Sequence, residues 1–493
     1  MTPRLTTLDG LPKGVARPGY LPSAHGVGIV HLGLGAFHKA HQAPYTDTAL
    51  AVAAGDWRIA GVSLRSPKPT LQLGPQNGLF TLIERDSKGS RARVIGAIAR
   101  ALCLGPDRAA VMDALTAPAT RIVSLTVTEK GYGVDRSTGG IDRGHKAIAH
   151  DLLHPDAPIG VAGLLILALG LRRAAGVAPF TVLCCDNLPD NGALVRGLLV
   201  DFARHAAPDL ADHIAAEVAF PATMVDRITP ASTEATRAAA RQMTGCLDEA
   251  AVEAESFCQW VIEDHFPTGR PAWEAAGALF VSDVRPYEEM KLRMLNGAHS
   301  MLAYAGFMAG HAHVADVMAD RALARLVHRH LGAAAATLPP LPDVDLEAYA
   351  AALMGRFANP HLRHATFQIA MDGTEKLPQR ILAPAVAALE AGQPIDAFAF
   401  ATAAWMRYVR GMREDGTAHD LRDPREEALR AALADTPAET VRALMALPGL
   451  FPRALRDSAS WTAAVTGRLE RMLAQGMKAA IAEEDRAARS AEA

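Results

Sequence analysis

The sequence has no long hydrophobic run. Its longest apolar segments, such as residues 161–171, are too short to span a bilayer and contain glycine breaks, and the N-terminus carries no hydrophobic signal core. The formal net charge is only −3, so there is no global basic field to hold nucleic acid. We therefore expect a cytoplasmic protein that binds neither a membrane nor a nucleic acid.

Cysteine is scarce, and the five cysteines include no pair at Cys-x-x-Cys spacing: Cys103, Cys184, Cys185, Cys246 and Cys258. Their odd number indicates reduced thiols rather than a disulfide framework. Cys184 and Cys185 follow an apolar run and are expected in a buried strand. A His-Glu-x-x-His motif and a clustered Cys/His set are also lacking, so the sequence gives little support to a zinc mechanism.

With 493 residues the chain is too long for one ordinary core, so more than one domain is expected. In the first half, apolar strand-like runs alternate with helix-like segments, which favours an α/β domain with a parallel-rich sheet covered on both faces. These runs are residues 26–35, 56–65, 121–132 and 178–188. From residue 283 onward, Ala- and Leu-rich segments with helical spacing dominate. We predict an α/β domain over 1–282 and an all-helical domain over 283–493.

Two glycines, Gly33 and Gly35, end the first strand-like run and precede a helix-like segment over 37–55. This is where a dinucleotide pyrophosphate uses a tight turn, although His38 stands where the third glycine of the usual fingerprint is expected. An ordinary glycine turn is the alternative. The next strand ends with Arg65 and Lys68 and no carboxylate for a ribose. Basic residues there would suit a 2′-phosphate, so NAD and NADP both stay open.

The segment 287–310 reads as an apolar helix that contains Lys291, Asn296 and His299. Tyr287 and Lys291 have the spacing of the short-chain dehydrogenases, but the glycine spacing and the distance from the turn do not fit that class. On an α-helix Asn296 and His299 lie about 140° and about 80° from Lys291, on one side. A lysine with a lowered pKa can exchange a proton with a hydroxyl or ketone, and Asn and His can donate to its oxygen. The alternative is a solvated lysine with Asn and His satisfied in the core.

Six long motifs in the same order identify a resemblance to the mannitol dehydrogenase family, the polyol-specific long-chain dehydrogenases and reductases, over almost the whole chain. They are IVHLGLGAFHKAHQAPYTD (29–47), IVSLTVTEKGY (122–132), FTVLCCDNLPDNG (180–192), FPATMVDRITP (220–230), WVIEDHFPTGRPAW (260–273) and YEEMKLRMLNGAHS (287–300). The resemblance implies a Rossmann-type N-terminal domain, a helical C-terminal domain, a substrate cleft between them, a monomer, and catalysis with a nicotinamide cofactor and without metal.

The resemblance also implies roles for single residues. Lys291 would be the general acid/base, Asn187 and Asn296 would form the oxyanion hole, and His299 would bind a substrate oxygen. Glu288 could relay the proton of Lys291, or could be a solvent-facing charge. The remaining expected site residues are Asp226 and Lys376 for the substrate, and Gly33, Gly35, Phe37 and Glu129 for the cofactor. Two departures stand out: Lys39 replaces the family's usual arginine, and Pro67–Lys68 replaces an acidic pair, which leaves strict NAD preference in doubt.

The substrate is indicated by residues 359–380. Gln368 stands where mannitol 2-dehydrogenases tend to have an arginine, and the run resembles the fructuronate reductases (D-mannonate oxidoreductases). A hexuronate carboxylate needs cations, and the candidates here are Arg363, His364, Lys376 and Arg380. A sugar phosphate would need cations too, and singly the arginines could be solvated. We expect reduction of D-fructuronate to D-mannonate, with a polyol 2-dehydrogenase acting on mannitol or arabinitol as the alternative. A nucleotide-sensing protein without turnover is the alternative from another class.

Overall fold

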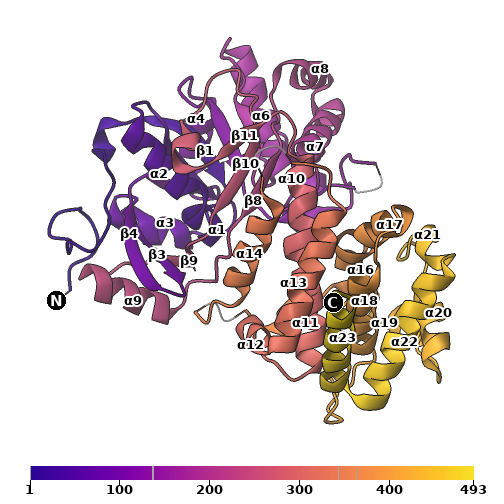
Figure 1. Ribbon diagram of the computed structural model, residues 1–493. Helices are drawn as coiled ribbons and strands as arrows, with labels where there is room; N and C mark the ends of the chain where they lie inside the picture. Colours follow the sequence, from indigo (N-terminus) through magenta and orange to yellow (C-terminus); the bar gives the residue numbers. More distant parts are fainter. Residues whose placement is uncertain (1, 136–137, 342–343, 362–363, 493) are drawn as a thin grey trace. The chain divides into compact units, whose positions relative to one another are not determined.

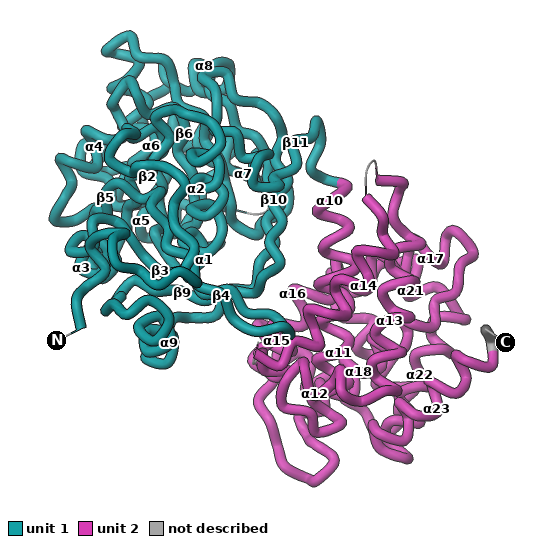
Figure 2. The backbone as a smooth tube through the Cα atoms, turned by 60° about the vertical axis from the view of Figure 1, so that its left-hand side comes forward, with its two compact units in different colours: residues 1–285 teal, residues 286–493 magenta. Residues whose placement is uncertain are grey.

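The structure is a computed structural model that describes residues 2–135, 138–341, 344–361 and 364–492. The chain forms two compact units, residues 1–285 and residues 286–493 (Figure 2). Each unit is described by itself. The division into domains expected after residue 282 stays a prediction, because compactness does not show that either part folds alone.

Unit 1, drawn in indigo to magenta in Figure 1, contains a main sheet of five parallel strands in the order β5-β2-β1-β6-β7. They are β1 (Val27–Leu32), β2 (Arg58–Ser63), β5 (Ile98–Cys103), β6 (Ile122–Leu125) and β7 (Thr181–Cys184). β2 follows β1 in the chain and pairs with one side of it, and β6, which comes later in the chain, pairs with the other side of β1. The strand order therefore reverses at β1, and ligands of such sheets bind at the carboxyl ends of the strands at this point.

Helices cover both faces of this sheet. Successive residues of a strand point to opposite faces, so neighbouring residues of β1 belong to two different cores. Val30 and Leu32 pack with residues of α4 (Arg108–Thr116), α6 (Val161–Ala174) and α7 (Asn191–Ala206), whereas Ile29 packs with residues of α2 (Gln42–Val52). The helices of unit 1 are α1 (Ala36–Ala40), α2 (Gln42–Val52), α3 (Lys68–Leu73), α4 (Arg108–Thr116), α5 (Lys146–Leu153), α6 (Val161–Ala174), α7 (Asn191–Ala206), α8 (Pro208–Glu217) and α9 (Glu234–Thr244). The single helix expected over 37–55 is broken at His41, whose backbone angles, φ −121° and ψ −84°, are not helical.

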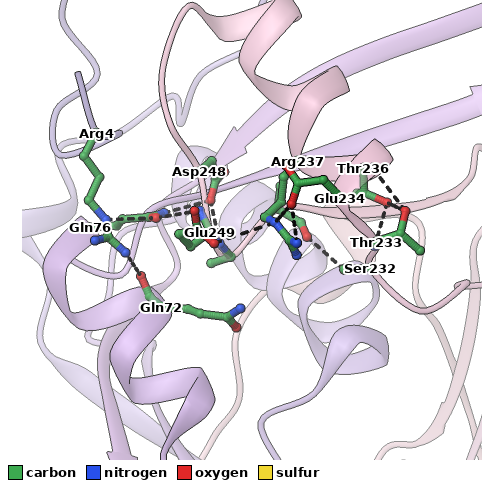
Figure 3. Close-up of polar contacts among 12 residues, drawn as sticks. Arg4, Gln72, Gln76, Ser232, Thr233, Glu234, Thr236, Arg237, Asp248 and Glu249 are labelled. Atoms are coloured by element: carbon green, nitrogen blue, oxygen red, sulfur yellow. Dashed lines mark hydrogen bonds and ion pairs between the residues drawn. The ribbon is translucent and has the colours of Figure 1, made fainter. Parts of the chain in front are cut away.

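Unit 1 also contains two three-stranded sheets that the sequence reasoning did not predict. One is β4 (Gly89–Ile95), β3 (Phe80–Asp86) and β9 (Val252–Glu255), and the other is β11 (Leu279–Val281), β10 (Gln259–Glu263) and β8 (Thr223–Asp226). The first sheet is tied to its surroundings by the buried carboxylate of Asp248 (Figure 3). The Asp248 carboxylate accepts hydrogen bonds from the backbone N–H groups of Thr81 (2.6 Å) and Ala250 (2.9 Å) and from the side-chain amide of Gln76 (2.8 Å).

Unit 2 is helical throughout its described part, and α11 (Gly297–Met308) lies wholly buried at its centre. Helices α13 (Arg321–Ala336), α15 (Thr366–Ala370) and α18 (Asp396–Val409) pack against it. The others are α10 (Arg285–Met290), α12 (Val314–Ala319), α14 (Leu346–Phe357), α16 (Gly373–Leu377), α17 (Ala383–Glu390), α19 (Glu426–Ala431), α20 (Pro437–Met445), α21 (Arg453–Arg456), α22 (Ala459–Gln475) and α23 (Met477–Glu492). The two units confirm the predicted fold class. Among the described helices, none has the length and apolar character needed to span a membrane.

Candidate functional site

The glycine turn lies at the carboxyl end of β1, at the reversal of strand order. Gly33 has φ +105°, and a Cβ there would lie 2.1 Å from the carbonyl oxygen of Thr126, so no other residue fits. The N–H groups of Gly33 and Leu34 donate to the Val62 carbonyl, which fixes the turn to β2. Gly35 is exposed, and α1 begins directly after it without a side-chain cap. The backbone therefore leaves both space and unpaired donors for an anionic group.

His38, which takes the place of the third fingerprint glycine, is a buried residue of α1. Its ring stacks on that of His31, with centroids 3.5 Å apart, and both rings are buried. The His31 ring nitrogens lie 2.9 Å from the hydroxyl oxygens of Ser124 and Thr126. Burial lowers the pKa of His31 to about 3 and holds the pKa of His38 well below its usual value. Both rings are therefore neutral near pH 7, and the departure from the glycine fingerprint has a packing explanation.

The other expected cofactor residues of this region lie on α1 and after β2. The ring of Phe37 stacks on His41, with centroids 4.9 Å apart. Arg65 and Lys68 are exposed, and neither forms an ion pair with a described residue. Their position fits the predicted contact with the ribose end of a dinucleotide, and their cofactor role stays a prediction.

Polar residues follow β6 and β7 at the same carboxyl edge. Glu129 and Asn187 are both exposed there. Asp186, the residue before Asn187, has a carboxylate that accepts hydrogen bonds from the N–H groups of Val127 (2.8 Å) and Thr128 (3.2 Å). Sequence reasoning did not single out Asp186 or Thr128. Asp226, expected to bind substrate, is the buried last residue of β8, where it pairs with Gln259 of β10.

Lys291 and Asn296 lie at the two ends of a π-helical segment, η5 (Lys291–Asn296), between α10 and α11. The α-helical angles predicted for this segment are therefore wrong. In a π-helix hydrogen bonds join residues five apart, so Lys291 and Asn296 are brought to successive turns above one another. Lys291 is buried, and the side-chain amide nitrogen of Asn296 is buried without a hydrogen-bond partner among the described residues. A buried unpaired donor is costly, which suits a group that donates to a bound ligand.

His299, one turn into α11, is surrounded by aromatic and cationic side chains of unit 2. Its ring stacks on Phe357, with centroids 5.1 Å apart, and meets His364 edge-on at 5.0 Å. Burial, and then the positive charges of His364, Arg380, Arg356 and Lys376, hold the pKa of His299 well below its usual value. The imidazole is therefore neutral near pH 7 and can donate one hydrogen bond. Arg356 is buried beside this group and was not predicted.

Arg380 lies in a second π-helical segment, η6 (Pro378–Leu382), which packs against η5. Its guanidinium donates to the Ser300 hydroxyl at 3.3 Å, and no carboxylate of the described residues lies within ion-pair distance. Burial lowers the pKa of Arg380. A charged group withdrawn from water without a counter-ion is unfavourable unless an anion joins it. Arg380 is therefore a candidate anion-binding residue.

Lys376 is engaged differently. Its ammonium donates to the carbonyls of Met371 (2.6 Å) and Ile369 (3.3 Å) and lies 3.7 Å from the Asp372 carboxylate. These contacts lie within the segment that precedes Lys376 in the chain. Two of the three ammonium donors are therefore used inside the protein, and one is left for a substrate. Arg363 lies outside the described residues. Within the described ranges, no group of three or more His, Cys, Asp and Glu residues is arranged to hold a metal ion.

Two family models cover most of the chain. The mannitol dehydrogenase Rossmann domain matches residues 27–275, and the mannitol dehydrogenase C-terminal domain matches residues 283–473. The chain belongs to the mannitol dehydrogenase family. Membership of this family makes it an oxidoreductase with a dinucleotide-binding Rossmann domain, and confirms the predicted resemblance.

Relatives within the mannitol dehydrogenase family carry different activities in their names. The chain is 43% identical over 476 residues to the uncharacterized oxidoreductase YeiQ of Escherichia coli, covering 96% of this chain and 97% of the relative. It is 40% identical to the D-mannonate oxidoreductase of the same organism (97% and 100% covered) and 41% identical to a mannitol 2-dehydrogenase of Cereibacter sphaeroides (87% and 91%). Identity alone therefore does not choose the substrate.

Solved structures of the family agree with the fold. The mannitol 2-dehydrogenase of Pseudomonas fluorescens, in a ternary complex with NAD and D-mannitol, has a TM-score of 0.84 at 38% identity, covering 98% of this chain and 99% of its own. A substrate-free D-sorbitol dehydrogenase has a TM-score of 0.90 at 34% identity, covering 98% and 100%. Both likenesses extend over the two units of this mannitol dehydrogenase family member.

Proposed function

We propose that this chain is a nicotinamide-dependent reductase of a keto-hexuronate, which converts D-fructuronate to D-mannonate. The observation that carries the proposal is Arg380, whose half-buried guanidinium lies beside the His299 group and has no carboxylate partner in the described part of the chain. A polyol offers only hydroxyl groups, whereas a hexuronate brings the carboxylate that this arginine lacks. The D-mannonate oxidoreductase of Escherichia coli, similar over 97% of this chain, supports the same choice.

In this proposal the bound cofactor supplies the hydride for the C-5 ketone, and the protein supplies the proton and the oxygen contacts. Lys291 gives its proton to the developing alkoxide. Asn187 and Asn296 donate hydrogen bonds to that oxygen, and neutral His299 donates one to a substrate oxygen. Arg380 holds the carboxylate, with Arg363 and Lys376 adding positive charge. Burial lowers the pKa of His364, so this ring is neutral near pH 7 and contributes a hydrogen bond. Asp226 accepts from substrate hydroxyls, and Glu288 relays the proton of Lys291.

For the cofactor we propose NAD or NADP bound on unit 1. The turn at Gly33 and Gly35 would hold the pyrophosphate, with Phe37 and Glu129 in contact. NAD is supported by the complex of the Pseudomonas fluorescens relative with NAD. The exposed Arg65 and Lys68, where an acid would otherwise bind the ribose, support acceptance of NADP. Metal-independent catalysis, a monomer, and domains at 1–282 and 283–493 complete the proposal.

A polyol 2-dehydrogenase is the second candidate. It is favoured by the mannitol 2-dehydrogenases, which are about as similar as the D-mannonate oxidoreductase, at 41% and 40% identity. It is disfavoured by Gln368, an exposed residue of α15 where those enzymes tend to have an arginine.

The deciding experiment is a substrate panel of fructuronate, tagaturonate, fructose and mannitol, each with NAD(H) and NADP(H). We expect turnover with fructuronate, and turnover of only fructose and mannitol would make the uronate assignment wrong. In the same assay Lys291→Ala should lower kcat by at least about 100-fold, because no other group replaces the proton donor. Cofactor affinity should stay near the wild-type value. A Lys291→Ala variant with normal turnover would remove the general acid from the proposal.

A further inference from the structure

Thr128, the residue before Glu129, has an unusual backbone conformation. Its angles, φ +68° and ψ +153°, lie in a region that is almost restricted to glycine. A β-branched side chain makes this conformation more unfavourable still. Strained residues of this kind persist only where the surrounding structure holds them, and they cluster at functional sites.

The carboxylate of Asp186 provides the hold. One oxygen accepts from the N–H of Val127 at 2.8 Å and from the Tyr132 hydroxyl at 2.6 Å, and the other accepts from the N–H of Thr128 at 3.2 Å. The contacts thus join the end of β7 to the turn that follows β6. Burial raises the pKa of Asp186 despite these three donors. Among the described residues the carboxylate has no ion-pair partner. The side-chain hydrogen bonds that it accepts therefore all come from residues 127–132.

We propose that Asp186 is a positioning residue that fixes the strained Thr128 turn and thereby sets how Glu129 and Asn187 are presented on the carboxyl edge of the sheet. Glu129 stands directly after the held turn, and Asn187 directly after Asp186. One side chain thus controls both neighbours. The proposal rests on the proposed function only in treating Glu129 and Asn187 as site residues.

The Asp186→Asn variant tests this sharply, because an amide has only one oxygen. In either orientation its NH2 group must face one of the two backbone N–H groups of Val127 and Thr128. We expect the amide protons of these two residues to lose protection from hydrogen exchange. We also expect kcat to fall about 10- to 100-fold, the usual effect of removing a group that orients site residues, with the KM for the ketone changed much less.

Asp248→Asn is the matched control. Asp248 also accepts from two backbone N–H groups and one side-chain donor, but it serves the β4-β3-β9 sheet (Figure 3). The Asp248→Asn variant should have a lower melting temperature than wild type, with kcat within about twofold of the wild-type value. Tyr132→Phe keeps both backbone contacts to Asp186 and should change kcat less than Asp186→Asn. An equal loss of kcat in Asp248→Asn would overturn the positioning role, because the effect would then be a general one.

The Thr128→Gly substitution tests the strain directly. Glycine adopts the Thr128 angles without a Cβ clash, so the turn then needs less support. The double variant Asp186→Asn with Thr128→Gly should therefore regain much of the turnover lost in Asp186→Asn alone. Unchanged protection at Val127 and Thr128 in Asp186→Asn, or an unchanged kcat, would overturn the proposal. The exchange measurement needs no substrate, so its result stands apart from the substrate panel and from Lys291→Ala.

Discussion

At the scale of single residues, the proposed chemistry depends on groups that are largely withdrawn from water before any ligand arrives. In unit 2 His299 is buried and Arg380 is half-buried, and the amide nitrogen of Asn296 lacks a described partner. Such arrangements reduce the folding free energy of the empty protein, since each desolvated group loses contacts with water that are not replaced. In the proposed function, a substrate that supplies a carboxylate and an oxygen restores these contacts. The unfavourable burial of these groups would then contribute both to the affinity for a hexuronate and to its selection over a neutral ketose.

Arg380 gives the most specific test at this scale. In Arg380→Met, kcat/KM for a hexuronate should fall about 100- to 1000-fold, because the charge pair between the guanidinium and the substrate carboxylate is lost. The kcat/KM for a neutral ketose should change by less than about tenfold, since a ketose has no carboxylate to lose. Parallel steady-state kinetics with both substrates give the ratio. Arg293→Met, which removes an arginine bonded to Thr337 and Glu289, is the control and should affect both substrates equally. Equal losses in Arg380→Met would exclude a carboxylate role.

Sequence reasoning finds residues of this kind unevenly. Lys291, Asn296 and His299 stand out as candidates in the sequence, because polar side chains are rare in so apolar a segment. Asp186 is not, because its role depends on β6 and β7 being neighbours in the sheet although they are far apart in the chain. Arg356 is missed for a similar reason: only the packing of α14 near α11 brings its charge close to His299.

At the scale of elements, the unexpected feature is the π-helical segment η5 and its neighbour η6. Four strands of the main sheet, β1, β2, β6 and β7, are predictable, because each is an apolar run between turn residues. The fifth strand, β5, is missed because it lies at the edge of the sheet and its apolar run is interrupted by Arg100. The small sheets are not predictable, since β8, β9 and β11 are short and are paired through non-local contacts. The π segment is missed because hydrophobic spacing was interpreted with the α-helical period. One additional residue in a helical turn leaves the spacing of the apolar residues almost unchanged. It does rotate the residues before the turn relative to those after it, compared with their positions on a continuous α-helix.

Removal of Leu292 tests the contribution of η5. In the deletion variant Lys291 and Asn296 are four residues apart, so an α-helix again places them on successive turns and nearly restores their π-helical relation. We expect kcat to stay within about tenfold of wild type, with helix content by circular dichroism unchanged. Insertion of one alanine after Leu292 instead adds a residue between them and turns Lys291 away from Asn296, which should lower kcat at least about 100-fold. An insertion variant as active as wild type would show that the placement of Lys291 relative to Asn296 has no part in turnover.

At the scale of the whole molecule, both units contain buried neutral histidines, and this predicts how the protein responds to acid. His31 and His38 lie in unit 1, and His299 and His330 lie in unit 2. Burial lowers the pKa of His31 to about 3 and that of His330 to about 4. In the unfolded chain a histidine has a pKa of about 6.5 and binds a proton below that pH, whereas these folded rings do not. Stability is therefore complete above about pH 6.5 and falls as the pH drops towards the folded pKa values.

Each such histidine should lower the free energy of unfolding by about 1.4 kcal/mol per pH unit between about pH 6.5 and pH 4. Urea unfolding at pH 7.5, 6.0 and 5.0 measures this slope. In His330→Leu the slope should be smaller by about one histidine's share, because the leucine binds no proton in either state. His328→Leu, which removes an exposed ring from the same helix, is measured alongside as the control. Because His330 belongs to unit 2, a separate transition of that unit should carry the whole difference. An unchanged slope in His330→Leu would show that the buried ring is already protonated in the folded state, and that acid lability originates elsewhere in the chain.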